Sequence, residues 1–228
     1  MVSNPQTAGT EVLRFAGAGV SQDDALQALR DYAEQRGGTL RWYDRAGGAS
    51  LPKPADAVEL ADIGRLVVIN ARLDADDVPQ LLEPFEPGLW TAVGHEVDFR
   101  DLPEDPRAEP AYTAVSELYL ALRDRPGIGR TKATKLLHLK RPRLVPVVDS
   151  VVLAHYRDTA TELARQWELK DPQYWAAIWS DARRNDPLVQ ALLKQLRQAG
   201  GPAAEVADLS PLRVHDILVW SRFRPRRD

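Results

Sequence analysis

One short segment near the middle of the chain carries most of the structural information: Arg125-Pro126-Gly127-Ile128-Gly129-Arg130-Thr131-Lys132-Ala133-Thr134-Lys135-Leu136-Leu137, followed closely by Val147-Val148-Asp149-Ser150. Apolar residues repeat at helical spacing on both sides of the glycines. Pro126 and Gly127 end the first helix, and Gly129 lets the backbone turn without a side chain in the way. The sequence therefore predicts two helices joined by a tight glycine hairpin, then a short apolar loop and a third helix that begins at Asp149.

The start of the second helix is an expected anion site. The first N–H groups of a helix have no intrahelical partners, and at a hairpin they point outward. Such a helix end attracts an anion, most often a phosphate. Arg130, Lys132 and Lys135 follow this turn in the sequence. We expect the hairpin to bind phosphate; the alternative is that these charges form an ordinary solvated face.

The segment resembles the helix-hairpin-helix DNA glycosylase superfamily. The resemblance rests on Pro126-Gly127-Ile128-Gly129, on a small polar residue at Thr131, and on Asp149 eighteen positions later, and it covers roughly residues 109–157. It implies a mostly helical fold in which the hairpin grips the DNA backbone and the aspartate lies at the mouth of a base pocket. The chain is also similar to an uncharacterised bacterial family of unknown function that carries the same hairpin, and that similarity implies no activity.

The glycosylase resemblance also implies roles for single residues. It implies DNA contacts for the hairpin and the turn after it: Gly127, Ile128, Gly129, Arg130, Thr131, Lys132 and Lys135. It implies a catalytic carboxylate at Asp149, which would stabilise the positive charge that grows on the sugar and orient the attacking water. The alternative for Asp149 is a purely structural helix cap.

Strand cleavage is not expected from this chain. Members of the superfamily that cut the DNA strand carry a lysine where this chain has Thr131, and that lysine forms a Schiff base with the sugar. Lys132 lies one position further, about 100° around the helix. The expected activity is therefore removal of a base without strand cleavage.

A base pocket needs aromatic residues that accept a flipped base. Tyr112 and Tyr119 are the preferred candidates, because they lie on the helix that leads into the hairpin. The alternative is that both pack in the core, as aromatic residues at helical spacing usually do.

The net charge of −3 hides a strong asymmetry between the two halves of the chain. Residues 1–122 carry 10 basic and 21 acidic residues, whereas residues 123–228 carry 20 basic and 12 acidic ones. Such asymmetry is a recognised pointer to a surface that binds a polyanion. The resemblance to DNA glycosylases implies that this polyanion is double-stranded DNA, which is the expected partner.

Composition also excludes several kinds of site. The chain has no cysteine, so disulfides, thiolate metal sites and iron–sulfur clusters are ruled out. Its four histidines form no close pair in the sequence. We expect no metal and no cofactor. No apolar run approaches the length of a membrane span and no signal sequence is recognisable, so a cytoplasmic protein without membrane association is expected.

The predicted fold is mostly α, with strand signals scarce. We expect an acidic helical lobe over residues 1–108 and a basic helix-hairpin-helix lobe over residues 109–228; the alternative is one continuous domain. Residues 94–108 are expected to form a surface loop, and residues 57–71 a helix buried on most sides. Helices are expected to begin at Ser21, Asp171-Pro172, Asp186-Pro187 and Ser210-Pro211, the last of them amphipathic.

The sequence thus predicts a DNA-binding helix-hairpin-helix protein that acts as a monofunctional DNA glycosylase through Asp149. Two alternatives stay open. One is a non-catalytic DNA-binding module that uses Asp149 only as a helix cap. The other is a protein-interaction adaptor whose acidic N-terminal half meets a basic partner.

Overall fold

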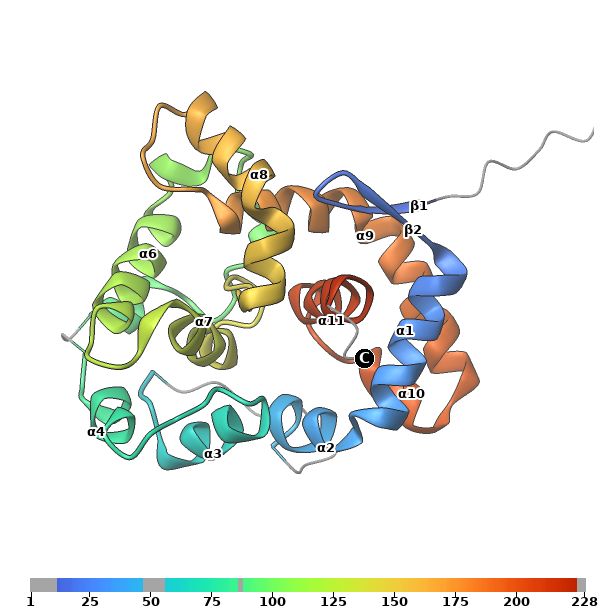
Figure 1. Ribbon diagram of the computed structural model, residues 1–228, viewed down its shortest axis with the longest axis horizontal. Coiled ribbons are helices and arrows are strands. Elements are labelled where there is room, and N and C mark those ends of the chain that lie inside the picture. Colours follow the sequence, from blue (N-terminus) through green and yellow to red (C-terminus); the bar gives the residue numbers. More distant parts are fainter. Residues whose placement is uncertain (1–11, 47–55, 86–87, 225–228) are drawn as a thin grey trace, which may run out of the picture.

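The computed structural model describes residues 12–46, 56–85 and 88–224, and it confirms a mostly helical fold (Figure 1). One small antiparallel sheet accompanies the helices in these residues. The elements in chain order are β1 (Val12–Phe15), β2 (Ala18–Ser21), α1 (Gln22–Gln35), α2 (Gly37–Thr39), a π-helical turn (Leu40–Asp44), α3 (Leu60–Val68), α4 (Asp77–Leu82), α5 (Leu89–Ala92), two 3₁₀ turns (Phe99–Asp101 and Pro106–Ala108), α6 (Pro110–Arg123), α7 (Gly129–Lys140), α8 (Ser150–Gln166), α9 (Tyr174–Ala199), α10 (Gly201–Val206) and α11 (Pro211–Phe223).

Two serine caps predicted from the sequence are confirmed. The Ser21 hydroxyl accepts a hydrogen bond from the Asp24 N–H at 3.1 Å and begins α1. The Ser210 hydroxyl accepts one from the Arg213 N–H at 3.1 Å and begins α11. Each cap satisfies one of the N–H groups that a helix start leaves unpaired.

Helix α9 corrects two predictions. It begins at Tyr174, and Asp171 does not cap it. It then runs through Pro187, where a separate helix was expected to start. Tertiary contacts outweigh the local proline signal, because Asn185 just before the proline binds β1: its side-chain amide accepts from the Arg14 N–H at 2.9 Å and donates to the Arg14 carbonyl at 2.7 Å.

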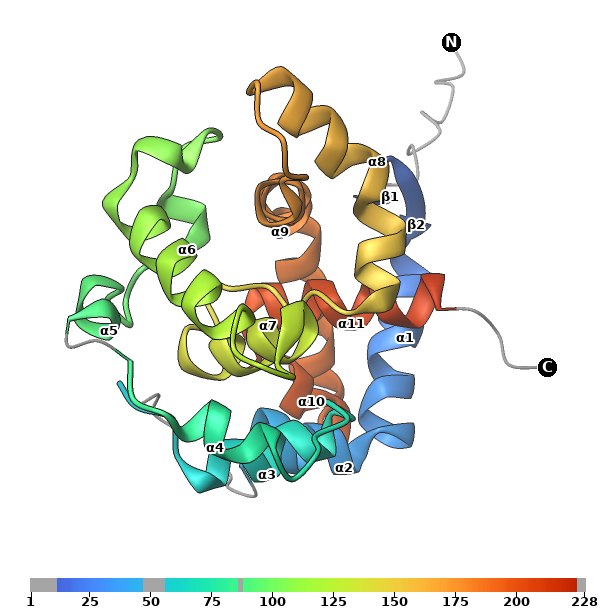
Figure 2. The same ribbon diagram turned by 60° about the vertical axis from the view of Figure 1, so that its left-hand side comes forward.

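Helix α11 is the central helix, and it is not amphipathic as predicted. Residues 212–219 are all buried, since α1, α8 and α9 surround the helix (Figures 1 and 2). A helix covered on all sides has to pair its polar residues inside the protein. The Arg213 guanidinium accordingly donates to the Asp44 carboxylate at 2.7 Å, and it also pairs with Asp216.

Helix α3 is less buried than predicted. Ile63 and Leu66 face the core, but Leu60 and Val67 are 70% and 61% exposed. The apolar composition of this helix therefore reflects two apolar faces, only one of which is covered.

Residues 94–108 are also not the plain surface loop that was predicted. They contain two 3₁₀ turns, and Phe99 is buried. The Asp98 carboxylate lies beneath the surface between two arginines, at 2.7 Å from Arg100 and 2.9 Å from Arg143. These contacts fix the segment against the loop that precedes α8.

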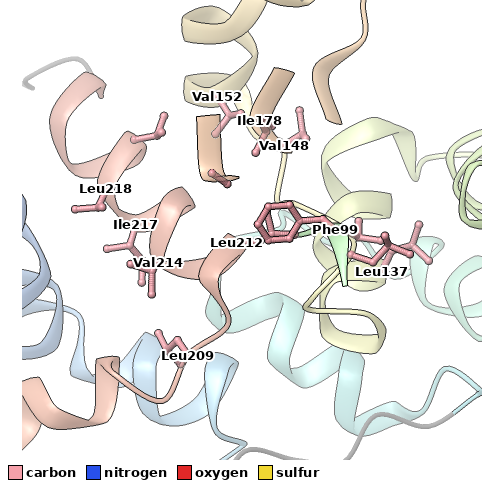
Figure 3. Close-up of a cluster of buried hydrophobic side chains, with 14 of the residues drawn as sticks. Phe99, Leu137, Val148, Val152, Ile178, Leu209, Leu212, Val214, Ile217 and Leu218 are labelled. Atoms are coloured by element: carbon pink, nitrogen blue, oxygen red, sulfur yellow. The ribbon is translucent and has the colours of Figure 1, made fainter. Parts of the chain in front are cut away.

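The hydrophobic core is one cluster to which both halves of the chain contribute. Figure 3 shows its central part, where Phe99 lies beside Leu137 of α7 and the same cluster includes side chains of α8, α9 and α11. Helix α1 packs on α9, α10 and α11, so the N-terminal half shares its core with the C-terminal half. The division at residue 108 stays a prediction, and these contacts favour its alternative, one continuous domain. Among the described residues, no helix is both long and apolar enough to cross a membrane.

Candidate nucleic-acid interface

The predicted hairpin is present between α6 and α7. Gly127 and Gly129 have φ angles of +77° and +58°, a region in which side chains other than glycine are strained. Ile128 between them is buried and anchors the turn, and its N–H donates to the Arg125 carbonyl at 3.2 Å. The two glycines are therefore required by the backbone geometry of the turn.

Asp149 caps α8, as predicted by the alternative to a catalytic role. One carboxylate oxygen, Oδ1, accepts from the N–H groups of Val151 and Val152 at 2.9 and 3.0 Å. The other oxygen, Oδ2, has no hydrogen-bond partner within the described parts of the chain. The side chain is half-buried, so this second oxygen is available to a ligand while the first is held in place.

Asp149 is held next to the hairpin helix by the residue before it. The Val148 N–H donates to the Thr134 hydroxyl at 3.1 Å, and the Thr131 hydroxyl donates to the Val148 carbonyl at 3.3 Å. Thr131 and Thr134 lie on the first turns of α7, so α7 and the start of α8 are fixed to each other. The structure thus brings together Asp149 and the hairpin, the two parts of the predicted site.

Lys132 is paired with an acidic residue of the chain itself beside the hairpin. Its ammonium group lies 2.6 Å from the carboxylate of Asp77, the first residue of α4, and it also donates to the Gly127 carbonyl at 2.8 Å. Asp77 is 3% exposed. Burial acts to raise the pKa of Asp77, but the hydrogen bond from Lys132, the hydrogen bond from the Asp74 N–H and the charge of Lys132 together hold that pKa below its ordinary value. Asp77 is therefore ionised, and its negative charge offsets the positive charge of Lys132 within the protein.

Lys135 is likewise used internally. It is 6% exposed, and its ammonium group donates to the carbonyls of Ile69 and Asn70 just after α3, at 3.0 and 3.4 Å. Free carbonyls at a helix C-terminus attract a cation. Burial lowers the pKa of Lys135, with Asp149 and Asp216 acting in the opposite direction. This buried amine caps α3 and is not a surface phosphate ligand.

The other basic residues next to the hairpin follow the same pattern. Arg125 donates to the carbonyls of Gln80 and Glu83 at the end of α4, Lys140 pairs with Asp62 of α3, and the buried Arg141 binds Asp56 and the carbonyls of Trp90 and Val93. All of these acceptors lie within residues 56–93, in the acidic half of the chain. Part of the charge asymmetry that predicted a polyanion partner is thus paired within the molecule.

Arg130 is the exception in this segment. Its guanidinium lies 5.1 Å above the ring centre of Tyr174 at the start of α9, and it has no ion pair or hydrogen bond with any residue that the structure describes. Gly129 beside it faces open space, since a side chain there would meet nothing within 4 Å. The first turn of α7 therefore keeps one cation that has no ion pair among the described residues, next to an exposed backbone.

The two tyrosines of the predicted base pocket pack against α9. Tyr112 donates a hydrogen bond to the Gln173 side chain at 3.2 Å and meets the Trp179 ring edge-on at 5.8 Å. Tyr119 meets Trp175 edge-on at 5.2 Å. Both tyrosines are half-buried. The structure therefore places them mainly as packing residues between α6 and α9, which was the alternative to a base pocket.

Metal-binding geometry does not occur in the described ranges 12–46, 56–85 and 88–224, where no three histidine, aspartate or glutamate side chains gather closely enough to hold an ion.

A buried charged pair, Asp216 and Arg213, lies near Asp149. There, burial raises the pKa of Asp216 to about 7, against the opposing effect of Arg213.

Comparison with known proteins assigns a family. A family of unknown function, DUF6308, matches residues 25–223. The chain belongs to this family. No curated protein and no solved structure matches it. The family match agrees with the predicted similarity to a family of unknown function, and the resemblance to DNA glycosylases stays a prediction.

Sequence reasoning identified the hairpin glycines, Ile128, Thr131 and Asp149 as neighbours. It missed Asp77, which takes the charge of Lys132, and Tyr174, which holds Arg130. One signal for Asp77 was present: an acidic N-terminal half and a basic C-terminal half can complement each other. That signal does not tell which acid meets which base.

Proposed function

We propose that this protein binds double-stranded DNA through its glycine hairpin and releases a base with the help of Asp149. One observation carries the proposal: a half-buried carboxylate with one bound and one free oxygen is fixed beside an open glycine turn. The hairpin contact would come from the backbone around Gly129 and from Arg130. Lys132 and Lys135, which the sequence predicted for this role, contribute nothing to it while their internal partners remain in place.

The chemistry asked of Asp149 is modest. Base release breaks the bond between the sugar C1′ and the base nitrogen; the bonding electrons and a proton leave with the base, while a water oxygen bonds to C1′. A carboxylate that stays ionised stabilises the positive charge on the sugar and accepts a hydrogen bond from the attacking water. The free Oδ2 of Asp149 suits both roles, because the two N–H groups on Oδ1 orient it. Thr131 cannot form a Schiff base, so the product would be an intact strand with an abasic site.

The test removes the charge of Asp149 and keeps the hydrogen bonds that cap α8. Asp149→Asn still accepts hydrogen bonds from the helix N–H groups. We expect base release from a duplex bearing a modified base to fall by about two powers of ten or more, with DNA binding unchanged or tighter. The measurement is release of base from a panel of duplexes carrying different damaged or modified bases, with binding followed by fluorescence anisotropy.

A matched control separates catalysis from capping. Ser210→Ala removes the cap of α11 and leaves the hairpin unchanged, so it should lower stability by about 1 kcal/mol and leave base release intact. Base release by Asp149→Asn at the wild-type rate would reject the catalytic role. Strand cleavage that borohydride traps as a covalent adduct would instead identify a lysine as the nucleophile.

A second candidate is a non-catalytic DNA-binding module. The capping contacts of Asp149 to Val151 and Val152 favour it, because they already account for an aspartate at this position. Normal duplex binding without release of any base from the panel would select this candidate. The adaptor hypothesis loses its main argument, since the acidic half meets the chain's own basic half.

A further inference from the structure

The feature that the proposed function leaves unexplained is the contact between α4 and the hairpin. Asp77 approaches Gly127 so closely that a Cβ on this glycine would lie 2.4 Å from Oδ1 of the carboxylate. The same carboxylate binds Lys132 through Oδ2. Close approach to a glycine and pairing with a cation are the contacts by which a glycine turn holds a phosphate. Here both are made by a carboxylate of the chain itself.

A second set of contacts holds α4 in this position. The Arg125 guanidinium, just before the hairpin, donates to the carbonyls of Gln80, Glu83 and Pro84 at 2.6, 2.8 and 3.5 Å. Both ends of α4 are thereby fastened to residues that flank the turn. In contrast, the Gly129 side of the same turn is uncovered.

We propose that α4 is an intramolecular cover of the hairpin, in which the Asp77 carboxylate takes the place of a DNA phosphate beside Gly127 and Lys132. The inference rests on the proposed function, because covering the hairpin affects binding only if the hairpin binds DNA. While α4 covers the turn, DNA can bind the backbone at Gly129 and the charge of Arg130. When α4 is displaced, DNA can also bind Lys132 and the Gly127 side of the turn. The duplex and α4 therefore compete for the same groups.

The test is Asp77→Asn, which removes the competing charge and nearly keeps the shape. We expect the variant to bind a 20-base-pair duplex roughly five- to tenfold more tightly than wild type at 0.1 M salt, with one additional phosphate contact in the salt dependence. The matched control is Asp76→Asn, which makes the same change in net charge at an exposed neighbour whose side chain makes no hydrogen bond or ion pair with the described residues. It should leave affinity and salt dependence close to wild type. Adding Lys132→Gln to Asp77→Asn should cancel the gain.

Whether α4 covers Lys132 can also be measured without DNA. The acetylation rate of Lys132, measured by mass spectrometry, should be far below that of the exposed Lys170 and Lys194 in wild type and should approach theirs in Asp77→Asn. Circular dichroism establishes that each variant is folded. Two results would overturn the proposal: Lys132 as reactive as Lys194 in wild type, or a reactive Lys132 in Asp77→Asn without a gain in affinity.

The two proposals fail in different ways. If Arg130→Gln abolishes the DNA binding of wild type while Asp77→Asn changes nothing, the hairpin binds DNA and the cover is rejected. If neither wild type nor Asp77→Asn binds the duplex although Lys132 has become reactive, DNA binding itself is rejected, and the competition proposed for α4 is rejected with it. Binding by Asp77→Asn alone would support both.

Discussion

At the scale of single residues, the two hairpin glycines have the same backbone requirement but different surroundings. Both have positive φ angles, yet only Gly127 faces another group, the carboxylate of Asp77. Sequence alone suggests that both glycines make room for a phosphate. The structure gives the close approach at Gly127 an internal cause, whereas at Gly129 the positive φ angle alone accounts for a glycine.

This difference predicts unequal effects on stability. Gly129→Ala should cost about 1–2 kcal/mol, the cost of a left-handed conformation for a residue with a side chain. Gly127→Ala carries the same cost and must also displace Asp77 from Lys132, so it should cost more by roughly 1–3 kcal/mol. Urea unfolding measures both. Gly64→Ala is the control, because Gly64 lies in α3 with nothing within 4 Å, and alanine should be neutral there or stabilise by up to about 1 kcal/mol.

The role assigned to Asp77 can be checked by a double-mutant cycle. In an Asp77→Ala background the extra cost of Gly127→Ala should disappear, while the cost of Gly129→Ala should persist. Equal costs for the two glycine variants in the wild-type background would contradict the close contact that the structure places at Gly127.

At the scale of elements, the sequence predicted helices well where a side chain caps the start, as at Ser21, Asp149 and Ser210. It was wrong where tertiary contacts override local signals. The Asp186-Pro187 pair resembles a helix start, but Asn185 and its neighbours hold α9 against β1. Likewise, Leu60 and Val67 look like core residues, and only the packing of α3 shows that they face outward.

Helices α7 and α11 each bury a histidine, and this predicts loss of stability in acid. Burial lowers the pKa of both His138 and His215 to about 3. The folded protein keeps them neutral, whereas the unfolded chain protonates them below their ordinary pKa of about 6.5. Their contribution to stability is therefore complete above pH 6.5 and is lost as the pH falls from 6.5 towards 3, at up to about 1.4 kcal/mol per pH unit for each histidine. Asp216 acts oppositely, because its raised pKa favours the folded state in acid and loses that effect as the pH rises from about 4 to 7.

A variant isolates the histidine contribution from that of Asp216. The Nδ1 atom of His138 lies 2.7 Å from the Val145 carbonyl, and the amide of His138→Asn can donate the same hydrogen bond without titrating. Between pH 6 and pH 5, the free energy of unfolding of this variant should fall less than that of wild type, by about 1 kcal/mol. Asp216 is present in both proteins and cancels in the comparison. Identical pH dependence of the two proteins would contradict the buried, neutral state of His138.

At the scale of the whole molecule, contacts between distant parts of the chain offset part of the charge asymmetry. Five basic residues of the segment around the hairpin bind groups within residues 56–93: Arg125, Lys132, Lys135, Lys140 and Arg141. Composition could reveal that the halves are oppositely charged, but the identity of each pair depends on the fold. This is why the predicted DNA contacts at Lys132 and Lys135 could not be evaluated from spacing alone.

These contacts predict that the chain unfolds as one unit. Removing residues 1–93 would uncover the core shared with α1 and leave the buried Arg141 and Lys140 without their acidic partners, and an unpaired buried charge costs several kcal/mol. The full-length protein should show one urea transition, with coincident curves by circular dichroism and tryptophan fluorescence. A fragment of residues 94–228 should lack a cooperative transition. Two separate transitions, or a fragment that folds cooperatively alone, would instead support the two-lobe division at residue 108.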